Sequence, residues 1–446
     1  MNSPHTDPDW FRYIPHFLSK RLMGRTQLHK AIHNSGWIFF DKILRAVLGL
    51  IVGAWVARYL GPSGFGELAY CIAFIGIFQS VVNLGLDGIV VREIASQPKR
   101  ASIILGTVFQ LRLLLGFALW ILALVVYGLS NTFNGPGILI VALVGAGMIF
   151  QVADTVDLWF QGNSQSKRSV LAKALAYLIS NAIRVGLILL TAPLIAFAAV
   201  IAFEGALTAY ALKISYHRFP SEGAWKKHLP EAKKLLKESW PYMISGLSIM
   251  LYMRIDQLMI KNMLGERELG IFAAIIPISN LWSMVPMAIC TSIAPLMARK
   301  KLEGPEAFNA ALVNMFRFFW ILCLAVIGII LLLSRPVIQF MYGQAYDEAI
   351  PVLNIYVLTC IPVFMGCGQG LWLLNERKSH LALIQTVAGA AASIAANLVF
   401  LPLWGVKGAA IAAVISYLIS AMAINVFLSR QLFVLQLGIK PRGVNK

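Results

Sequence analysis

Charged residues are scarce in this chain of 446 residues, where Asp, Glu, Lys and Arg make up 13% of the sequence. A soluble domain usually contains about 25%. Hydrophobic residues account for 59%, and they gather in repeated runs of about 20 residues, each long enough to cross a bilayer core as a helix. The alternating pattern that a membrane-spanning barrel needs is missing. The composition therefore predicts an all-α polytopic membrane protein.

Cysteine and histidine are also rare, and neither is placed to hold a metal. The five cysteines lie in or beside apolar runs without metal-ligand spacing, and the seven histidines lie in the termini and polar connections. We therefore expect no metal site, no haem and no disulfide framework.

Signatures of covalent chemistry are missing as well. The sequence contains no G-x-x-x-x-G-K-[ST] phosphate loop, no HExxH motif and no nucleophile elbow. The connections between apolar runs lack the large, carboxylate-bearing loop that a membrane glycosyltransferase or polymerase would use. These absences favour a transporter without a cofactor over an enzyme, although a non-transporting assembly scaffold also fits the sequence.

Twelve apolar segments have the length of membrane-spanning helices. We expect them near 34–60, 67–91, 102–128, 137–160, 169–192, 195–216, 240–264, 268–297, 310–334, 350–374, 380–402 and 407–431. Most of the 38 Lys and Arg residues lie on alternate connections and at both termini, which predicts that both termini are cytoplasmic. The formal net charge of +18 reflects this topology rather than nucleic-acid binding.

One long basic connection divides the segments into two sets of six. The expected organisation is a cytoplasmic N-terminal segment (1–33) without the apolar core of a signal peptide, an N-lobe (34–216), a basic linker (217–238), a C-lobe (239–432) and a cytoplasmic tail (433–446). The stretch "PEAKKLLKES" in the linker suits either a short amphipathic helix on an anionic membrane surface or a solvated connection.

An internal repeat supports the division into halves. The segments "LGPSGFGELA" (60–69) and "LGERELGIFA" (264–273) align without gaps at an offset of 204 residues. Each copy lies at the outer turn between the first two helices of its half, where glycine permits a tight reversal. Because each half has six helices, the halves share one orientation, and we expect a pseudo-two-fold axis along the membrane normal.

Charged residues inside the predicted spans are the main candidates for function, because a charge there costs roughly 2.5 kcal/mol or more unless it faces a partner or a cavity. Three acid–base pairs can form along one helix or between adjacent helices, namely Asp41 with Arg45, Glu204 with Arg184, and Asp157 with Lys173. Such pairs are structural in the simplest interpretation, and Lys42 can extend to the membrane surface.

Arg254 and Asp256 differ from these pairs. Two residues apart on a helix, they point in different directions and cannot pair with each other, so at least one faces another helix or a central cleft. Arg112 and Arg317 have no acidic neighbour along the sequence. The residues predicted to line a cleft are Lys42, Arg45, Arg112, Arg254 and Arg317, with Trp159 as an aromatic surface for sugars or, alternatively, an interface anchor. Asp256 or Asp154 can instead titrate or bind a coupling cation.

Several segments resemble the polysaccharide-biosynthesis flippases (Wzx type) of the MOP superfamily, which also contains the MATE transporters. They are "WVARYLGPSGFGELAY" (55–70), "LWFQGNSQSKRSVLAKAL" (158–175), "RIDQLMIKNMLGERELGIFAAI" (254–275) and "MYGQAYDEAIPVLNIY" (341–356). Their order and spacing agree with that family across nearly the whole chain. The charged "FFDKILR" of the first span departs from the commoner uncharged pattern, which leaves the roles of Asp41, Lys42 and Arg45 open.

The resemblance implies a two-lobed MATE-like fold and alternating access in the inner membrane. Its expected cargo is a polyprenyl-diphosphate-linked oligosaccharide for O-antigen, capsule or exopolysaccharide synthesis. A guanidinium is the expected partner for the diphosphate, because its fork of donors binds oxyanions in pairs. The implied partners are this lipid, the surrounding membrane lipids, a polysaccharide polymerase or chain-length machinery, and H⁺ or Na⁺ for coupling.

Other readings of the same sequence remain. A cation-coupled multidrug or metabolite exporter of the MATE type is the main alternative, and it would need a carboxylate cluster and a more apolar cavity. A lipid II flippase usually has two more helices than the twelve predicted for this chain.

Overall fold

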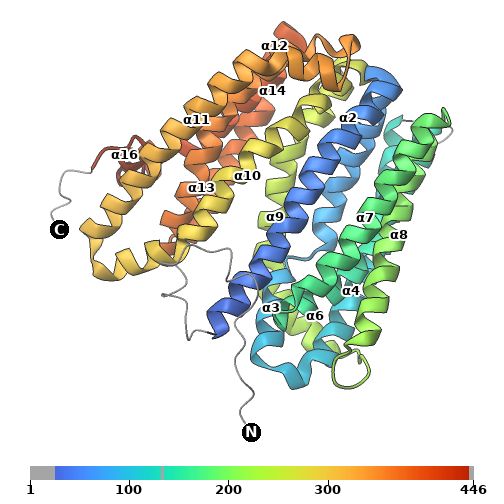
Figure 1. Ribbon diagram of the computed structural model, residues 1–446, viewed down its shortest axis with the longest axis vertical. Coiled ribbons are helices and arrows are strands. Elements are labelled where there is room, and N and C mark those ends of the chain that lie inside the picture. The colour runs from blue at the N-terminus through green and yellow to red at the C-terminus, as the bar shows by residue number, and fades with distance from the viewer. Residues whose placement is uncertain (1–25, 132–134, 441–446) are drawn as a thin grey trace, which may run out of the picture.

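The computed structural model describes residues 26–131 and 135–440, and almost all of this part of the chain is helical (Figure 1). The long helices are α2 (Thr26–Val82), α4 (Ala101–Asn131), α5 (Pro136–Phe150), α7 (Ser166–Leu189), α8 (Leu194–Arg218), α9 (Leu229–Leu264), α10 (Glu266–Glu303), α11 (Pro305–Met341), α13 (Cys360–Asn375) and α14 (Ser379–Leu418). The short helices are α3 (Asp87–Ser96), α6 (Asp154–Gly162), α12 (Ala349–Tyr356), α15 (Asn425–Leu428) and α16 (Arg430–Gln436). Most of the predicted N-terminal segment (1–33) and the end of the predicted tail (433–446) lie outside the described residues.

Ten candidate membrane spans occur among the described residues, and two of them contain a break. Gly61 interrupts α2 with φ 68° and ψ 172°, and Gly405 interrupts α14 with φ 57° and ψ −137°. Glycine adopts these positive φ values without the strain that a Cβ atom would add. The sequence predicts the end of one span and the start of the next at both positions.

Three connections differ from the predictions. The span expected over 67–91 is interrupted where α2 ends at Val82 and α3 begins at Asp87. Leu84 and Gly85 have positive φ values there, and a Cβ on Gly85 would lie 2.7 Å from the backbone nitrogen of Met243. The helix is therefore interrupted at the point where α9 approaches closely.

The connection expected after residue 334 is instead largely helix, because α11 continues to Met341. Ser334 and Ile338 are buried, so packing extends the helix beyond its apolar window. The stretch "PEAKKLLKES" of the predicted linker is helical, as one of the two alternatives expects, but it is the start of the long helix α9, which continues through Pro241, rather than a separate short helix.

The helices form two groups that are in close contact near the Gly61 break. In Figure 1, α2 to α8 lie on one side, α10 to α16 lie on the other, and α2 approaches α10 near the Gly61 break. A Cβ on Gly66 would lie 1.8 Å from the carbonyl oxygen of Glu266, and a Cβ on Gly270 would lie 1.8 Å from the carbonyl oxygen of Pro62. The 204-residue repeat offset relates Pro62 to Glu266 and Gly66 to Gly270. The contact is therefore reciprocal, as it is between parts related by a two-fold axis.

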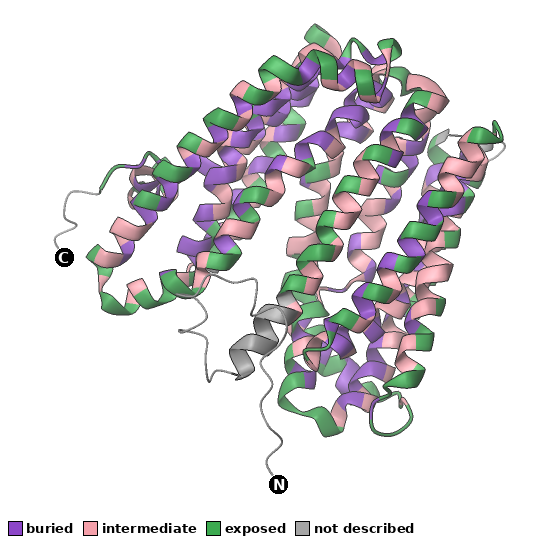
Figure 2. Cartoon of the chain, in the orientation of Figure 1, coloured by how far each residue is buried: buried purple, intermediate pink, exposed green. Residues whose placement is uncertain are grey.

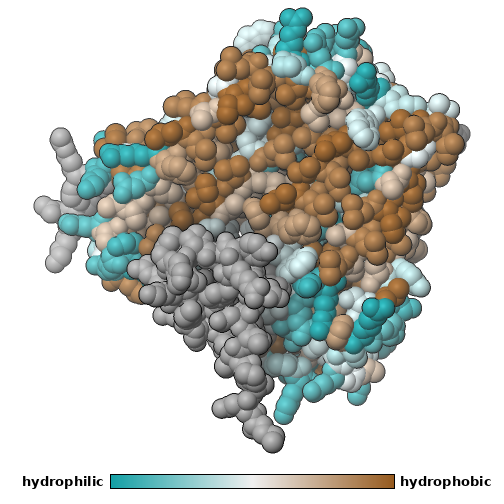
Figure 3. All heavy atoms as spheres, in the orientation of Figure 1, coloured by the Kyte–Doolittle hydropathy of each residue, from teal (hydrophilic) through white to brown (hydrophobic). Residues whose placement is uncertain are grey.

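The outer surface is apolar over most of its height. Large hydrophobic side chains are exposed on α4, α11 and α14, including Leu129 at 76% and Leu332 at 81%. Figure 2 shows the buried residues on the inward sides of the helices, and Figure 3 shows a broad hydrophobic band between hydrophilic patches at the top and bottom of this face. Such continuous apolar surface is typical of contact with lipid.

The reciprocal glycine contact gives a first prediction. Gly66→Ala or Gly270→Ala forces a backbone carbonyl to move, and we expect the apparent free energy of unfolding to fall by about 1–3 kcal/mol, as in overpacked cores. Thermal unfolding of the purified protein in detergent measures this change. Gly64→Ala is the matched control, because its new methyl group makes only an ordinary 3.4 Å contact with the Leu60 side chain. Equal melting of all three variants would contradict the close contact.

Candidate functional site

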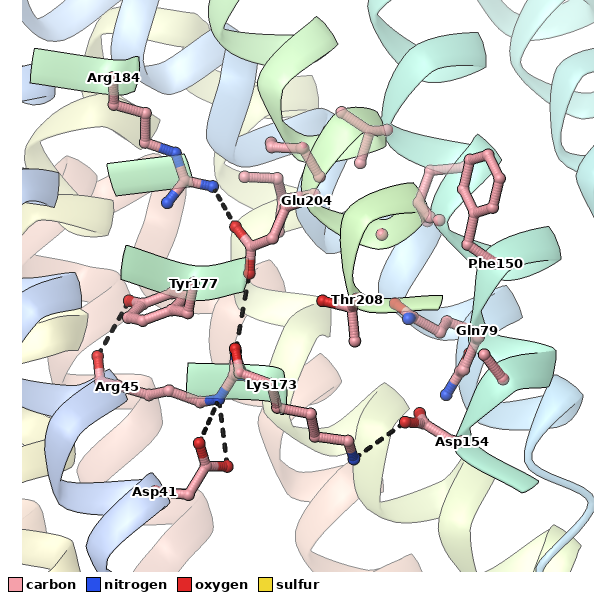
Figure 4. Close-up of a pocket in the computed structure, with 18 residues that line it drawn as sticks. Asp41, Arg45, Gln79, Phe150, Asp154, Lys173, Tyr177, Arg184, Glu204 and Thr208 are labelled. Atoms are coloured by element: carbon pink, nitrogen blue, oxygen red, sulfur yellow. Dashed lines mark hydrogen bonds and ion pairs between the residues drawn. The ribbon is translucent and has the colours of Figure 1, made fainter. Parts of the chain in front are cut away.

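A cavity of about 490 Å³ lies among α2, α5, α7 and α8 and is lined by charged residues of both signs (Figure 4). We call it the charged pocket. Its charged and polar lining residues are Asp41, Arg45, Gln79, Gln151, Asp154, Lys173, Tyr177, Arg184, Glu204 and Thr208. Helical spacing explains part of this convergence, because residues four apart share a face, as do Asp41 and Arg45 of α2 and Lys173 and Tyr177 of α7.

Two guanidinium groups of the pocket share one carboxylate. Glu204 lies 2.8 Å from Arg184 and 3.6 Å from Arg45, and Arg45 also contacts Asp41 at 3.1 Å. The Tyr177 ring lies 4.7 Å from the Arg45 guanidinium carbon, and its hydroxyl donates to the Arg45 carbonyl over 3.1 Å. Gly49 makes room for this hydroxyl, because a Cβ there would lie only 3.0 Å from it.

Lys173 is held by two carboxylates at the other side of the pocket. Its ammonium lies 2.9 Å from Asp154 and 2.6 Å from Asp157, and Gln161 donates to Asp157 over 3.1 Å. The three predicted acid–base pairs are thus confirmed, and Asp154 is an additional partner. The three cations of this network face four carboxylates, so the pocket has no excess positive charge.

Arg254 has different surroundings. It lies on α9, partly buried, and its Nη1 donates to Gln257 over 3.4 Å. A Cβ on Gly76 of α2 would lie 3.9 Å from its Nε, so the side chain lies where α9 faces the other group of helices. Within residues 26–131 and 135–440, no carboxylate lies within ion-pair distance of this guanidinium.

Asp256 faces α14, on the other side of α9 from α2. It is buried at 8% exposure and accepts hydrogen bonds of 2.7 Å from the Ser393 hydroxyl and the Asn397 amide of α14. The two-residue spacing on α9 thus directs Arg254 towards α2 and Asp256 towards α14. Ser393 was not predicted, although its spacing of four from Asn397 within an apolar span is a signal for a polar helix contact.

The remaining predicted site residues lie outside the charged pocket. Arg112 is 1% exposed and pairs with Asp87, and its Nε and Nη1 have no hydrogen-bond partner among the described residues. Arg317 is exposed, and its Nε donates to the Gly438 carbonyl over 2.8 Å. Folding therefore supplies Arg112 with an acidic partner 25 residues earlier in the chain, which local sequence did not predict.

The last two candidates lie at the periphery of the helices. Lys42 is exposed, one residue beyond the pocket-lining Asp41. Trp159 is partly exposed, and its indole nitrogen donates to the Phe219 carbonyl over 3.1 Å. Of the residues predicted for substrate or ion contact, the structure thus brings Arg45 and Asp154 together in one cavity.

Comparison with known proteins identifies the family of the chain. Residues 31–301, more than half of the chain, match the family described as polysaccharide biosynthesis protein. A Shigella flexneri protein whose name links it to O-antigen transport is 22% identical over 345 residues, which cover 73% of this chain and 80% of the relative.

Several solved structures have a similar fold. A multidrug resistance MATE transporter of the MOP superfamily, in an inward-facing conformation, has a TM-score of 0.74 at 16% identity and covers 88% of this chain and 96% of its own. The lipid II flippase MurJ, in an inward closed conformation, has a TM-score of 0.70 at 14% identity and covers 91% of this chain and 90% of its own. At these identities the likeness shows the fold.

The shared carboxylate of the charged pocket gives a second prediction. Glu204→Gln leaves Arg45 and Arg184 with less compensation, and we expect the apparent free energy of unfolding to fall by about 2 kcal/mol, less than for a fully buried pair because these side chains are about one-fifth exposed or more. Thermal unfolding in detergent measures it. Adding Arg184→Gln should restore part of the loss, and Glu222→Gln on the exposed connection should be neutral. A Glu204→Gln protein as stable as the unmodified one would contradict the assigned role.

Proposed function

The chain belongs to the polysaccharide biosynthesis protein family and is a multi-pass membrane transporter of the MOP superfamily, and from this premise we propose that it flips lipid-linked oligosaccharides. The cargo is a polyprenyl-diphosphate-linked repeat unit for O-antigen, capsule or exopolysaccharide. A glycan cannot cross hydrocarbon unaided, since each unpaired polar group costs several kcal/mol. The polyprenyl tail stays in lipid while the headgroup passes between the two groups of helices.

The uncompensated Arg254 is the observation that carries this proposal. A partly buried guanidinium that has no carboxylate partner in the described part of the chain is costly, so its retention at the face between α9 and α2 suits a site that an anion visits. A diphosphate offers that anion and accepts paired hydrogen bonds from the guanidinium fork. Release also remains easy, because a single cation binds more weakly than a cluster.

Arg45 is the second residue that we propose for the headgroup. It lines the charged pocket, where its pairing with Asp41 and Glu204 leaves polar atoms for sugar hydroxyls rather than a free positive charge. Lys42, Arg112, Arg317 and Trp159 lie outside this pocket in the described conformation, and contact with the cargo would require the two groups of helices to move.

The architecture that we propose has twelve crossings in two six-helix lobes. The breaks at Gly61 and Gly405 each divide one long candidate span into two crossings, which brings the ten candidate spans to twelve crossings. The reciprocal contact of Gly66 and Gly270 supports a pseudo-two-fold axis along the membrane normal. The lobes cover 34–216 and 239–432, joined by the basic linker 217–238. Because basic residues gather on cytoplasmic connections, we propose that both termini are cytoplasmic, and we propose the inner membrane as the location of the chain.

Substitution of Arg254 tests the proposed function. In cells that lack the native gene, Arg254→Ala should reach the membrane at normal levels but lower surface polysaccharide more than tenfold, because removing a buried charged contact typically costs about 2–5 kcal/mol. Lipid-linked repeat units should accumulate on the cytoplasmic leaflet. Arg254→Lys should retain part of the activity, and Arg335→Ala, on an exposed position of α11, should behave like the unmodified protein. Normal surface polysaccharide in Arg254→Ala would remove this residue from the mechanism.

We also propose that Asp256 couples transport to H⁺ or Na⁺, with Asp154 as the second candidate. Asp256 has a buried carboxylate that accepts from the Ser393 hydroxyl and the Asn397 amide and has no cationic partner among residues 26–131 and 135–440, so it can take up a proton or a sodium ion. In Asp256→Asn the new amide can still form a hydrogen bond with Ser393 or Asn397, but it cannot bind a proton or a sodium ion. We therefore expect transport by this variant to lose its dependence on the ion gradient.

Flipping of a fluorescent lipid-linked sugar in vesicles with an imposed pH or sodium gradient measures this dependence. Asp347→Asn, at an exposed position before α12, is the control. Persistence of the full gradient dependence in Asp256→Asn would exclude Asp256 and leave Asp154 for the same experiment.

A further inference from the structure

A second cavity, of about 460 Å³, lies between α4 and the segment that leads into α9. We call it the interfacial pocket. Its lining residues are Thr107, Gln110, Leu111, Leu114, Lys227, His228, Leu229 and Ala232. It shares no lining residue with the charged pocket, and no residue of this set is acidic.

The wall formed by the linker is fixed on α4. The backbone nitrogen of Lys226 donates to the Ser102 carbonyl over 3.3 Å, and that of His228 donates to the Thr107 hydroxyl over 3.2 Å. Gly106 permits this approach, because a Cβ there would lie 2.6 Å from the Lys226 carbonyl oxygen. The pocket is therefore formed before a ligand arrives, which lowers the entropic cost of binding.

One end of the interfacial pocket suits an anion. Lys227 is exposed, and the ring Nδ1 of His228 accepts from the backbone nitrogen of Glu231 over 3.3 Å. A neutral imidazole that accepts at Nδ1 carries its proton on Nε2, which is left as a donor. The start of the 36-residue helix α9 adds its partial positive charge. The nearby carboxylate of Glu231 is held in an ion pair with Arg100.

The other end of the pocket continues onto the lipid-facing surface. Leu114 is 63% exposed, and Phe117 and Ile121 follow on the same face of α4, at 50% and 45%. Leu229 is 84% exposed beside the charged end. Trp225 packs edge-on against Phe109 of α4 with the ring centroids 5.4 Å apart, as is common for aromatic residues at headgroup depth. The ligand that fits has a charged head and an apolar tail.

We propose that the interfacial pocket binds an anionic glycerophospholipid of the surrounding bilayer. Its phosphate lies against Lys227, the Nε2–H of His228 and the start of α9, and one acyl chain runs over Leu114 towards Phe117. Basic pockets at the polar ends of membrane helices bind anionic headgroups in this way. The lipid holds the first turns of α9 against α4, and α9 is the helix that carries Arg254. The site is independent of the transported cargo and stands even if the cargo is different.

Lipid retention tests the proposal. Protein is reconstituted in nanodiscs of equal phosphatidylglycerol and phosphatidylcholine, released into a mild detergent, and its bound lipids are counted by native mass spectrometry. The unmodified protein should retain phosphatidylglycerol in preference to phosphatidylcholine. Lys227→Gln combined with His228→Asn should lower that retention at least fivefold, since asparagine preserves the helix cap while the two anion contacts are lost.

Control variants distinguish binding of the lipid in the interfacial pocket from nonspecific attraction of anionic lipids to basic residues. Lys237→Gln removes one charge from an exposed position of the same helix outside the pocket and should retain the lipid, as should Lys227→Arg. Leu114→Ala removes the proposed acyl-chain contact without adding a charge and should also lower the amount of bound phosphatidylglycerol, which keeps the test valid if the double variant does not fold. The proposal would be overturned if Lys237→Gln lost as much phosphatidylglycerol as the double variant, or if the unmodified protein retained phosphatidylglycerol and phosphatidylcholine equally. Displacement of the lipid by inorganic phosphate at equal concentration would also overturn it.

Discussion

A charge inside a bilayer must be compensated by the protein itself, because hydrocarbon supplies neither water nor counter-ions. The helices around the charged pocket satisfy this constraint by sharing partners, with Glu204 between Arg45 and Arg184 and with Lys173 between two carboxylates. These contacts hold α2, α7 and α8 together more firmly than apolar packing in lipid can, since lipid chains compete with apolar side chains but not with ion pairs. This pairing joins α2, α7 and α8 around the charged pocket.

Arg254 does not follow this pattern of ion pairing. Where α9 faces α2, its guanidinium has only the Gln257 amide as a hydrogen-bond partner among the described residues. Near the Gly61 break, Gly66 and Gly270 lie against backbone carbonyls, so the helices are in close contact there. A close helix contact together with a guanidinium that has no carboxylate partner among the described residues is the basis of the proposed transport of an anionic headgroup.

Much of this architecture follows from the sequence, and the exceptions have physical reasons. Apolar length and the glycine turns predict the spans and the break at Gly61, and helical spacing predicts the pair of Asp41 and Arg45. The interruption at Gly85 and the pairing of Arg112 with Asp87 were not predictable, because both depend on how closely distant helices approach. Hydropathy windows also end helices too early, since they ignore the packing that prolongs α11 to Met341.

The central claim is that Arg254 meets the diphosphate of the lipid-linked sugar. Its most direct test is a cryo-EM structure of the purified protein in nanodiscs with a polyprenyl-diphosphate-linked sugar bound. The account predicts phosphate density within hydrogen-bond distance of the Arg254 guanidinium, about 3 Å, between α9 and α2. A diphosphate bound elsewhere, with Arg254 turned to a carboxylate of this chain, would contradict it.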